Sequence, residues 1–146
     1  MSSPNVNHNV HAARWVTTAA TASNRDVGAL TAAGGATDTL TSEWIDTSGW
    51  TDRVVSVDVD SEGTIDFNLT MHISSQGYYE LNNKTCTTED YVAVAIVDAL
   101  ASGVYTRYDS DDVDELKIPV RSVRFVIEND QAEPVTGAYV KIEGWS

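Results

Sequence analysis

Apolar side chains recur at every second position over residues 122–128 and again over residues 138–143. Polar residues, a proline and a glycine separate the two runs, as is typical of a turn. A period of two places the apolar residues on one face of an extended chain. The two runs therefore predict two strands of one half-buried antiparallel sheet.

The same alternation covers two longer stretches in the middle of the chain. Residues 53–60 alternate valine with polar residues, and residues 64–73 repeat the pattern with larger side chains, including Phe67 and Met71. A short loop containing Gly63 joins the two stretches, so we expect them to form a hairpin. Shorter strands are expected at residues 40–46, 77–81 and 104–108.

Residues 88–102 fit two structures. Thr87 or Thr88 followed by Glu89-Asp90 is a good helix start, and Gly103 is a good helix stop. The alternation of valine or isoleucine with alanine over residues 92–96 instead suits a strand. We favour one short helix, because both ends carry capping residues and the segment closes on Ala-Leu-Ala.

About seven or eight short strands, with turns at roughly 8–12-residue intervals, predict an all-β fold, a jelly roll or β-sandwich of antiparallel strands. This domain is expected to span residues 40–146. Residues 1–39 are rich in Ala, Thr, Asn and Ser and cannot bury enough surface to fold alone, so they predict an extended N-terminal arm. Trp15 stands out in the arm and packs either on its own domain or into a neighbouring subunit, so it is a candidate interface residue.

The charge balance narrows the classes of function. With 22 acidic against 9 basic residues, the formal net charge is −13. A chain this acidic lacks the basic footprint needed to bind nucleic acid or an anionic membrane, and we expect neither as a partner. An acidic surface poor in lysine is typical of proteins from salt-loving organisms, and an ordinary acidic protein is the alternative. Cys86 is the single cysteine, so no intrachain disulfide is expected, and the sequence predicts neither a signal peptide nor a membrane-spanning segment.

An acidic run at residues 109–115 is the candidate for a cation site. Its carboxylates at Asp109, Asp111, Asp112 and Asp114 are the oxygen ligands that Ca²⁺, Mg²⁺ or Na⁺ prefers. A solvated loop is favoured over a cage, because no glycine shapes the run. We therefore expect no cofactor, with a weakly bound cation here as the alternative.

Catalytic chemistry has no clear sequence signature. His8 and His11 lie in the arm, His72 lies on the outward face of a strand, and no nucleophile motif accompanies them. We expect no catalytic residues and no enzyme, although a hydrolase using two carboxylates stays open. Another alternative is a sugar-stacking face, formed from Trp44, Trp50, Tyr78, Tyr79, Tyr105 and Tyr108.

Four segments carry a resemblance to a known family. They are SEWIDTSGW (42–50), VVSVDVDSEGTIDFNLTMHIS (54–74), PVRSVRFVIEND (119–130) and TGAYVKIEGW (136–145). In this order they resemble the small jelly-roll structural proteins of tailed double-stranded DNA viruses. The family's polar S-x-D-G turn is replaced here by Ser-Ser-Gln-Gly at residues 74–77.

The resemblance implies a non-enzymatic virion protein: a head decoration, turret or tail-associated subunit. The acidic composition fits a virus of a halophilic archaeal host. Such a subunit is expected to form a homo-oligomer, a trimer or pentamer, and to contact a major capsid protein or other virion proteins. It would lie on the capsid surface of the virion and assemble in the host cytoplasm. Besides Trp15, Arg121 and Arg124 are candidate interface residues, through ion pairs with the many acids. A receptor- or carbohydrate-binding jelly roll is the alternative.

Overall fold

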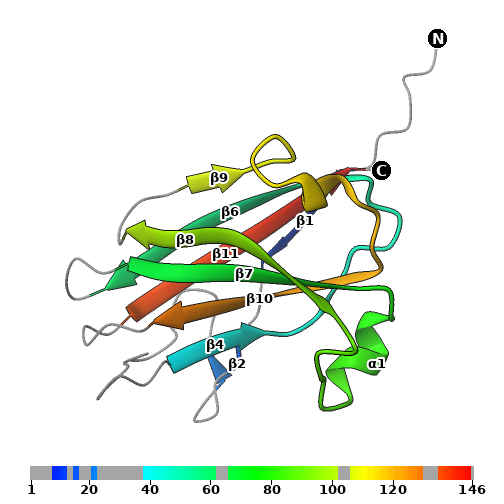
Figure 1. The fold of residues 1–146 in the computed structure, drawn as a ribbon, viewed down its shortest axis with the longest axis horizontal. Coiled ribbons are helices and arrows are strands. Elements are labelled where there is room, and N and C mark those ends of the chain that lie inside the picture. The colour runs from blue at the N-terminus through cyan, green and yellow to red at the C-terminus, as the bar shows by residue number, and fades with distance from the viewer. Residues whose placement is uncertain are drawn as a thin grey trace.

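Two antiparallel β-sheets face each other and form a sandwich (Figure 1). The computed structural model describes residues 8–12, 15–16, 21–22, 38–61, 66–101, 106–129 and 135–145. Four strands make one sheet in the order β1-β11-β6-β9, and seven make the other along the path β3-β2-β4-β10-β7-β8, with β5 beside β10. The predicted all-β sandwich is confirmed.

The elements have the following bounds. The four-stranded sheet contains β1 (His8–Ala12), β11 (Val135–Trp145), β6 (Asp52–Ser61) and β9 (Thr106–Tyr108). The seven-stranded sheet contains β2 (Trp15–Val16), β3 (Thr21–Ala22), β4 (Asp38–Ser42), β5 (Ile45–Asp46), β7 (Asp66–Ser74), β8 (Val92–Ala101) and β10 (Ser122–Asn129). One short helix, α1 (Tyr78–Asn82), and one 3₁₀ turn, η1 (Asp114–Lys117), complete the described elements.

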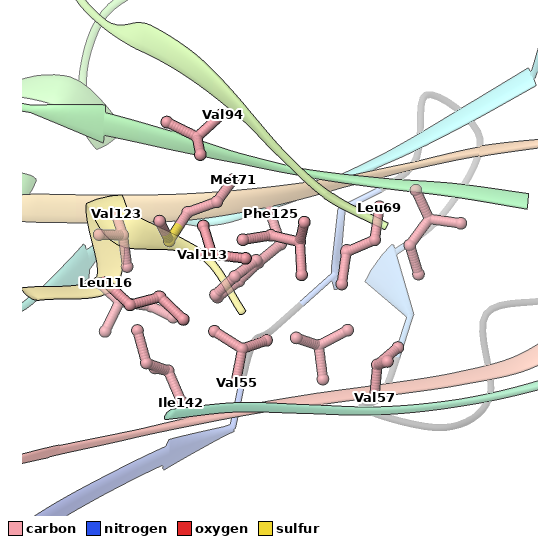
Figure 2. Close-up of a cluster of buried hydrophobic side chains, with 14 of the residues drawn as sticks. Val55, Val57, Leu69, Met71, Val94, Val113, Leu116, Val123, Phe125 and Ile142 are labelled. Carbon is pink, nitrogen blue, oxygen red and sulfur yellow. The ribbon is translucent and has the colours of Figure 1, made fainter. Parts of the chain in front are cut away.

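The core lies between the sheets and is built from the apolar positions of the alternating runs (Figure 2). Its fully buried members are Val55, Val57, Val140 and Ile142 from the four-stranded sheet and Leu69, Met71, Val123, Phe125 and Ile127 from the other. Burying one such side chain stabilises the fold by about 1.5–3 kcal/mol relative to leaving it exposed. Val113 and Leu116, just before and within η1, are buried in the same cluster.

Two of the predicted strand pairings are wrong. The strands β6 and β7 are not a hairpin, because β6 pairs with β11 and β9 while β7 pairs with β10 and β8. Likewise β10 and β11, expected in one sheet, lie in opposite sheets. Alternation shows which side of a strand is buried, and both sheets bury that side against the same core. It does not show which strand lies alongside, so the chain can cross between sheets with the pattern unchanged.

The helix expected at residues 88–102 is also wrong. This segment forms β8, which pairs with β7 from Ile73↔Val92 onward. The alternating branched residues bury Val94 and Ile96 in the core, and that burial outweighs the capping signals. The short helix of the domain is α1 instead, where a strand was expected at residues 77–81. The strand expected at residues 40–46 is interrupted, because two residues separate β4 from β5.

Described parts of the N-terminal segment extend both sheets. Strand β1 pairs with β11, and β2 pairs with β4 and with β3. These three short strands therefore lie on their own domain, joined to it through backbone pairing. The division of the chain at residue 40 stays a prediction.

A tryptophan closes the core at the end of β11. Trp50 is 7% exposed, and a Cβ built on Gly144 would lie 2.1 Å from its Cε3 atom. The adjoining backbone is tied down, since the Thr51 amide donates to the Trp145 carbonyl at 2.8 Å. Glycine at position 144 is thus required by the close approach of the indole.

Candidate functional site

Four side chains gather on the outward face of the seven-stranded sheet: Trp44, His72, Tyr91 and Arg124, called here the outer cluster. His72 on β7 and Arg124 on β10 are register partners, and the Arg124 Nε donates to the His72 Nδ1 at 3.0 Å. The imidazole stacks on Tyr91, with ring centroids 3.9 Å apart and an interplanar angle of 11°. The guanidinium carbon lies 4.7 Å from the Trp44 ring centroid and 5.1 Å from that of Tyr91. The cluster combines cation–π, stacking and hydrogen-bonding contacts.

Burial and charge together keep His72 neutral. The residue is 9% exposed. Burial, and then the positive charge of Arg124, lower the pKa of His72 to about 4. Because Nδ1 accepts the hydrogen bond from Arg124, the ring proton is assigned to Nε2. With one nitrogen bonded and one ring face covered, His72 is placed to hold the cluster together rather than to act as a base.

The outer cluster is joined to α1 through one asparagine. The Trp44 amide donates to the Asn82 Oδ1 at 2.7 Å, and the Asn82 Nδ2 donates to the Trp44 carbonyl at 3.1 Å. The preceding residue, Leu81, is 1% exposed and anchors the helix. An open hollow of about 420 Å³ borders this junction, between Glu43, Lys84 and Arg124.

Asp90 fixes the connection from α1 to β8. Its carboxylate accepts bonds from the Lys84 Nζ at 2.6 Å, the Thr87 amide at 2.8 Å and the Gln76 Nε2 at 3.0 Å. These donors, with Lys84 contributing most, hold the pKa of Asp90 well below its usual range. The helix and the connection therefore form a fixed platform on the sheet.

Arg121 lies at a corner of the sandwich between two hollows of about 370 and 210 Å³, both of which it lines together with Ser48. Its backbone is fixed, because its amide donates to the Ser74 carbonyl and its carbonyl accepts from the Thr47 amide. The smaller hollow also has Tyr78, Tyr79, Asp46 and Glu80 on its border, and the larger has Ser75, Pro119 and Val120. We call these nine residues the corner groove.

The candidate cation ligands lie in a compact turn before η1. The Asp109 Oδ1 accepts from the Asp111 amide at 2.9 Å, and the Asp112 Oδ2 accepts from the Asp109 amide at 3.0 Å. Asp114 is close to Lys117, with 4.0 Å between the carboxylate oxygen and Nζ. Two of the four carboxylates thus bind backbone within the turn, and no group of three or more His, Cys, Asp or Glu residues suited to a metal occurs in the described part of the chain. The weakly bound cation stays a prediction.

A buried arginine fastens this turn to the sheet. Arg53, which is 0% exposed, donates to the carbonyls of Glu115 and Ile118. Burial lowers its pKa to about 10, and the nearby Asp52 opposes that change, so the guanidinium keeps its charge at neutral pH. Its Nε is buried without a hydrogen-bond partner. Alternation places Arg53 on the same face of β6 as the core residues Val55 and Val57, but arginine is seldom buried unless its charge is paired.

The predicted interface residues differ in position. Arg124 belongs to the outer cluster, whereas Arg121 is exposed in the corner groove. Trp15 forms part of β2, with Ser42 as its backbone partner, and its side chain lies outside the described residues. All three interface assignments stay predictions. The corner groove itself went unnoticed in the sequence, because strand β5, helix α1 and residues 119–121 come together only in the fold.

No helix within the described ranges has the length and apolar character needed to cross a membrane.

Cys86 is a free, half-buried thiol whose sulfur lies 3.5 Å from the Leu81 carbonyl oxygen. Its environment beside α1 is that of a packing residue.

No protein-family model and no curated protein matches this chain. Among solved structures it is similar to a chain of infectious bursal disease virus, Gx strain, with a TM-score of 0.47 and 15% identity over 99% of this chain. It is also similar to the infectious bursal disease virus VP2 subviral particle, with a TM-score of 0.48 and 12% identity over 97% of this chain. The chain spans 33% of the length of each of these structures. Likeness at this level is shared among β-sandwich proteins of unrelated function and leaves the function open.

Proposed function

We propose that this chain is a non-enzymatic structural protein of a virion, a capsid decoration or turret subunit that assembles through its N-terminal arm and β-sandwich. The observation that supports the proposal most is the way residues 8–12, 15–16 and 21–22 add strands to both sheets. Strand β1 joins the four-stranded sheet, and β2 with β3 joins the seven-stranded one. A segment that binds through backbone pairing can make the same pairings with a neighbouring copy, and such exchange is a low-cost route to assembly.

The described polar clusters support a structural role. The imidazole of His72 is engaged by Arg124 and Tyr91, and Arg53 binds backbone carbonyls. These groups stabilise loops on the two sheets. The resemblance of residues 42–50, 54–74, 119–130 and 136–145 to jelly-roll proteins of tailed viruses points to the same role.

The net charge of −13 suits a protein that stays dispersed at high salt, as in a virus of a halophilic host. A closed ring of three or five copies, on a shell of a major capsid protein, is the expected arrangement. A tail-associated position is the alternative within the same class.

The mass of the full-length protein in high salt tests the proposal. We expect a closed trimer or pentamer, and we expect Trp15→Ala and Val10→Pro to lower its mass or its stability to dilution. The proline removes a backbone donor from β1, which pairs there with Glu143. Arg107→Ala, an exposed change on β9, is the control. A wild-type protein that stays monomeric at every concentration would reject assembly as its function.

A further inference from the structure

The corner groove holds the most exposed aromatic side chains of the described residues. Tyr79 is 72% exposed and Tyr78 is 44% exposed, and both line the groove from α1. By contrast, Trp44 and Trp50 of the sugar-stacking face considered from the sequence are buried. The other aromatic side chains that the structure describes are buried or half-buried. Two rings left in solvent next to a hollow therefore suit contact with a ligand.

Around these rings the groove offers both hydrogen-bond acceptors and donors. Asp46 and Glu80 provide carboxylate oxygens, Ser48 a hydroxyl, and Arg121 a planar guanidinium with five N–H groups. Carboxylates and guanidinium groups bind pairs of neighbouring hydroxyls through two parallel bonds, and such charge-assisted bonds are strong. This combination is the complement of a ring with apolar C–H faces and hydroxyls at its edge.

The groove is also rigid. Leu81 and Asn82 fix α1 to the sheet, the Ser122 Oγ donates to the Gln76 carbonyl at 2.8 Å, and the Asp46 Oδ1 accepts from the Ser48 amide at 2.9 Å. The turn between β5 and β6 contains Gly49 with a φ of 81°, a conformation that favours glycine. A ligand would therefore bind without ordering these elements, and preorganisation of this kind increases affinity.

Size and charge select the class of ligand. The two hollows of about 370 and 210 Å³ together match ligand pockets, which are about 300–1,000 Å³. Two carboxylates beside the groove, on a chain of net charge −13, disfavour sulfated glycans and other polyanions. We infer that the corner groove is a binding site for neutral saccharides, with the ring of Tyr79 as the stacking platform and with Arg121, Asp46 and Glu80 as hydroxyl partners.

This inference goes beyond the proposed structural role and would give the subunit a second function, attachment to a neutral surface glycan. The test measures binding of the full-length protein to galactose, glucose, N-acetylglucosamine and their neutral oligosaccharides. Saturation-transfer NMR and calorimetry detect the binding. Heparin fragments provide the charged comparison. At least one neutral saccharide is expected to bind, with saturation transferred from the protein to the ring protons of the bound saccharide.

Variants identify the site. Tyr79→Ala and Arg121→Ala should each weaken binding by about tenfold or more, a change of about 1.4 kcal/mol. Tyr79→Phe keeps the ring and should bind within about threefold of the wild type. Arg107→Ala removes an exposed arginine from β9, away from the groove, and should bind normally. Thermal unfolding shows that each variant is folded.

Three results would overturn the inference: no binding by any neutral saccharide, binding only to heparin fragments, or equal binding by Tyr79→Ala and the wild type. The oligomeric mass is measured in the same samples. A protein that forms the ring but binds no saccharide would reject the inference and leave the proposed function intact. A protein that stays monomeric but binds saccharide would support the inference and reject the proposed function.

Discussion

The inner core and the outer cluster occupy opposite faces of the same two strands, β7 and β10, and they are built differently. Met71 and Phe125 face the core and are fully buried in its cluster of hydrophobic side chains. Their sequence neighbours His72 and Arg124 face outward, yet His72 is almost as deeply buried. Residues outside the strands, Trp44 and Tyr91, complete the cluster around them. The comparison shows that the period of two along a strand sets the side of the sheet to which each side chain points. Residues outside the strands determine whether a side chain on the outward face is exposed to water.

The inner core should be the more sensitive of the two to truncation. Phe125 is 0% exposed and lies at the centre of the buried cluster (Figure 2). Phe125→Ala should lower the free energy of unfolding by about 3–5 kcal/mol, because it removes buried apolar area and leaves a cavity. Urea denaturation monitored by circular dichroism measures this change. Tyr79→Ala, at an exposed ring, is the control and should stay within about 0.5 kcal/mol of the wild type. A loss below about 1 kcal/mol for Phe125→Ala would show that the core is not centred on this ring.

The outer cluster should respond to acid in a way that the inner core cannot. The pKa of His72 is lowered to about 4 in the fold from 6.5, so the unfolded chain binds its proton first as the pH falls. The stabilisation is complete above pH 6.5 and is lost as the pH falls through the window down to about 4. The full loss is about 3 kcal/mol, since each pKa unit corresponds to about 1.36 kcal/mol.

The contribution of His72 is isolated by comparison with His72→Gln, which does not titrate. Urea denaturation of both proteins at intervals from pH 7 to pH 4 measures the difference in pH dependence. We expect the wild type to lose more stability than the variant across this range, because carboxylates such as Asp90 affect both proteins alike. Parallel pH profiles would show that His72 titrates normally in the folded protein and that Arg124 does not hold it neutral.

The same contrast explains how much could be predicted from the sequence. Alternation correctly identified the strands containing Val55, Met71, Phe125 and Ile142 and the side that each strand buries. It failed on pairing, because both sheets bury the same kind of face and the chain crosses between them. For residues 88–102 we set the alternation aside in favour of a helix, because of the capping residues around Thr87 and Asp90. In the fold these two residues bond to each other in a turn before β8.

The candidate sites were less accessible to sequence reasoning, because they join distant segments. His72 and Arg124 were both assigned to outward faces, but nothing local showed that they are register partners beneath Trp44. Tyr79 and Arg121 are more than forty residues apart in the printed sequence and share a groove only through the packing of α1. Alternation within β6 places Arg53 on the inner face, but it does not reveal the carbonyls of residues 115 and 118 that accept hydrogen bonds from its guanidinium.

Asn82 gives the smallest expected effect and the sharpest test of the difference between the two regions. It forms two hydrogen bonds with the backbone of Trp44, so Asn82→Ala leaves the amide and carbonyl of that residue without these partners. The free energy of unfolding should fall by about 1–2 kcal/mol. Asn83→Ala is the matched control; it removes one exposed bond to the Tyr79 carbonyl and should cost about 0.5 kcal/mol or less.

If the outer cluster is one unit held by this junction, Asn82→Ala and His72→Gln should be non-additive, with a coupling of about 0.5 kcal/mol or more. Asn82→Ala and Val57→Ala should be additive, because Val57 lies in the opposite sheet. Additivity in both pairs would mean that Trp44 holds its position without the helix, and that the outer cluster depends on β7 and β10 alone.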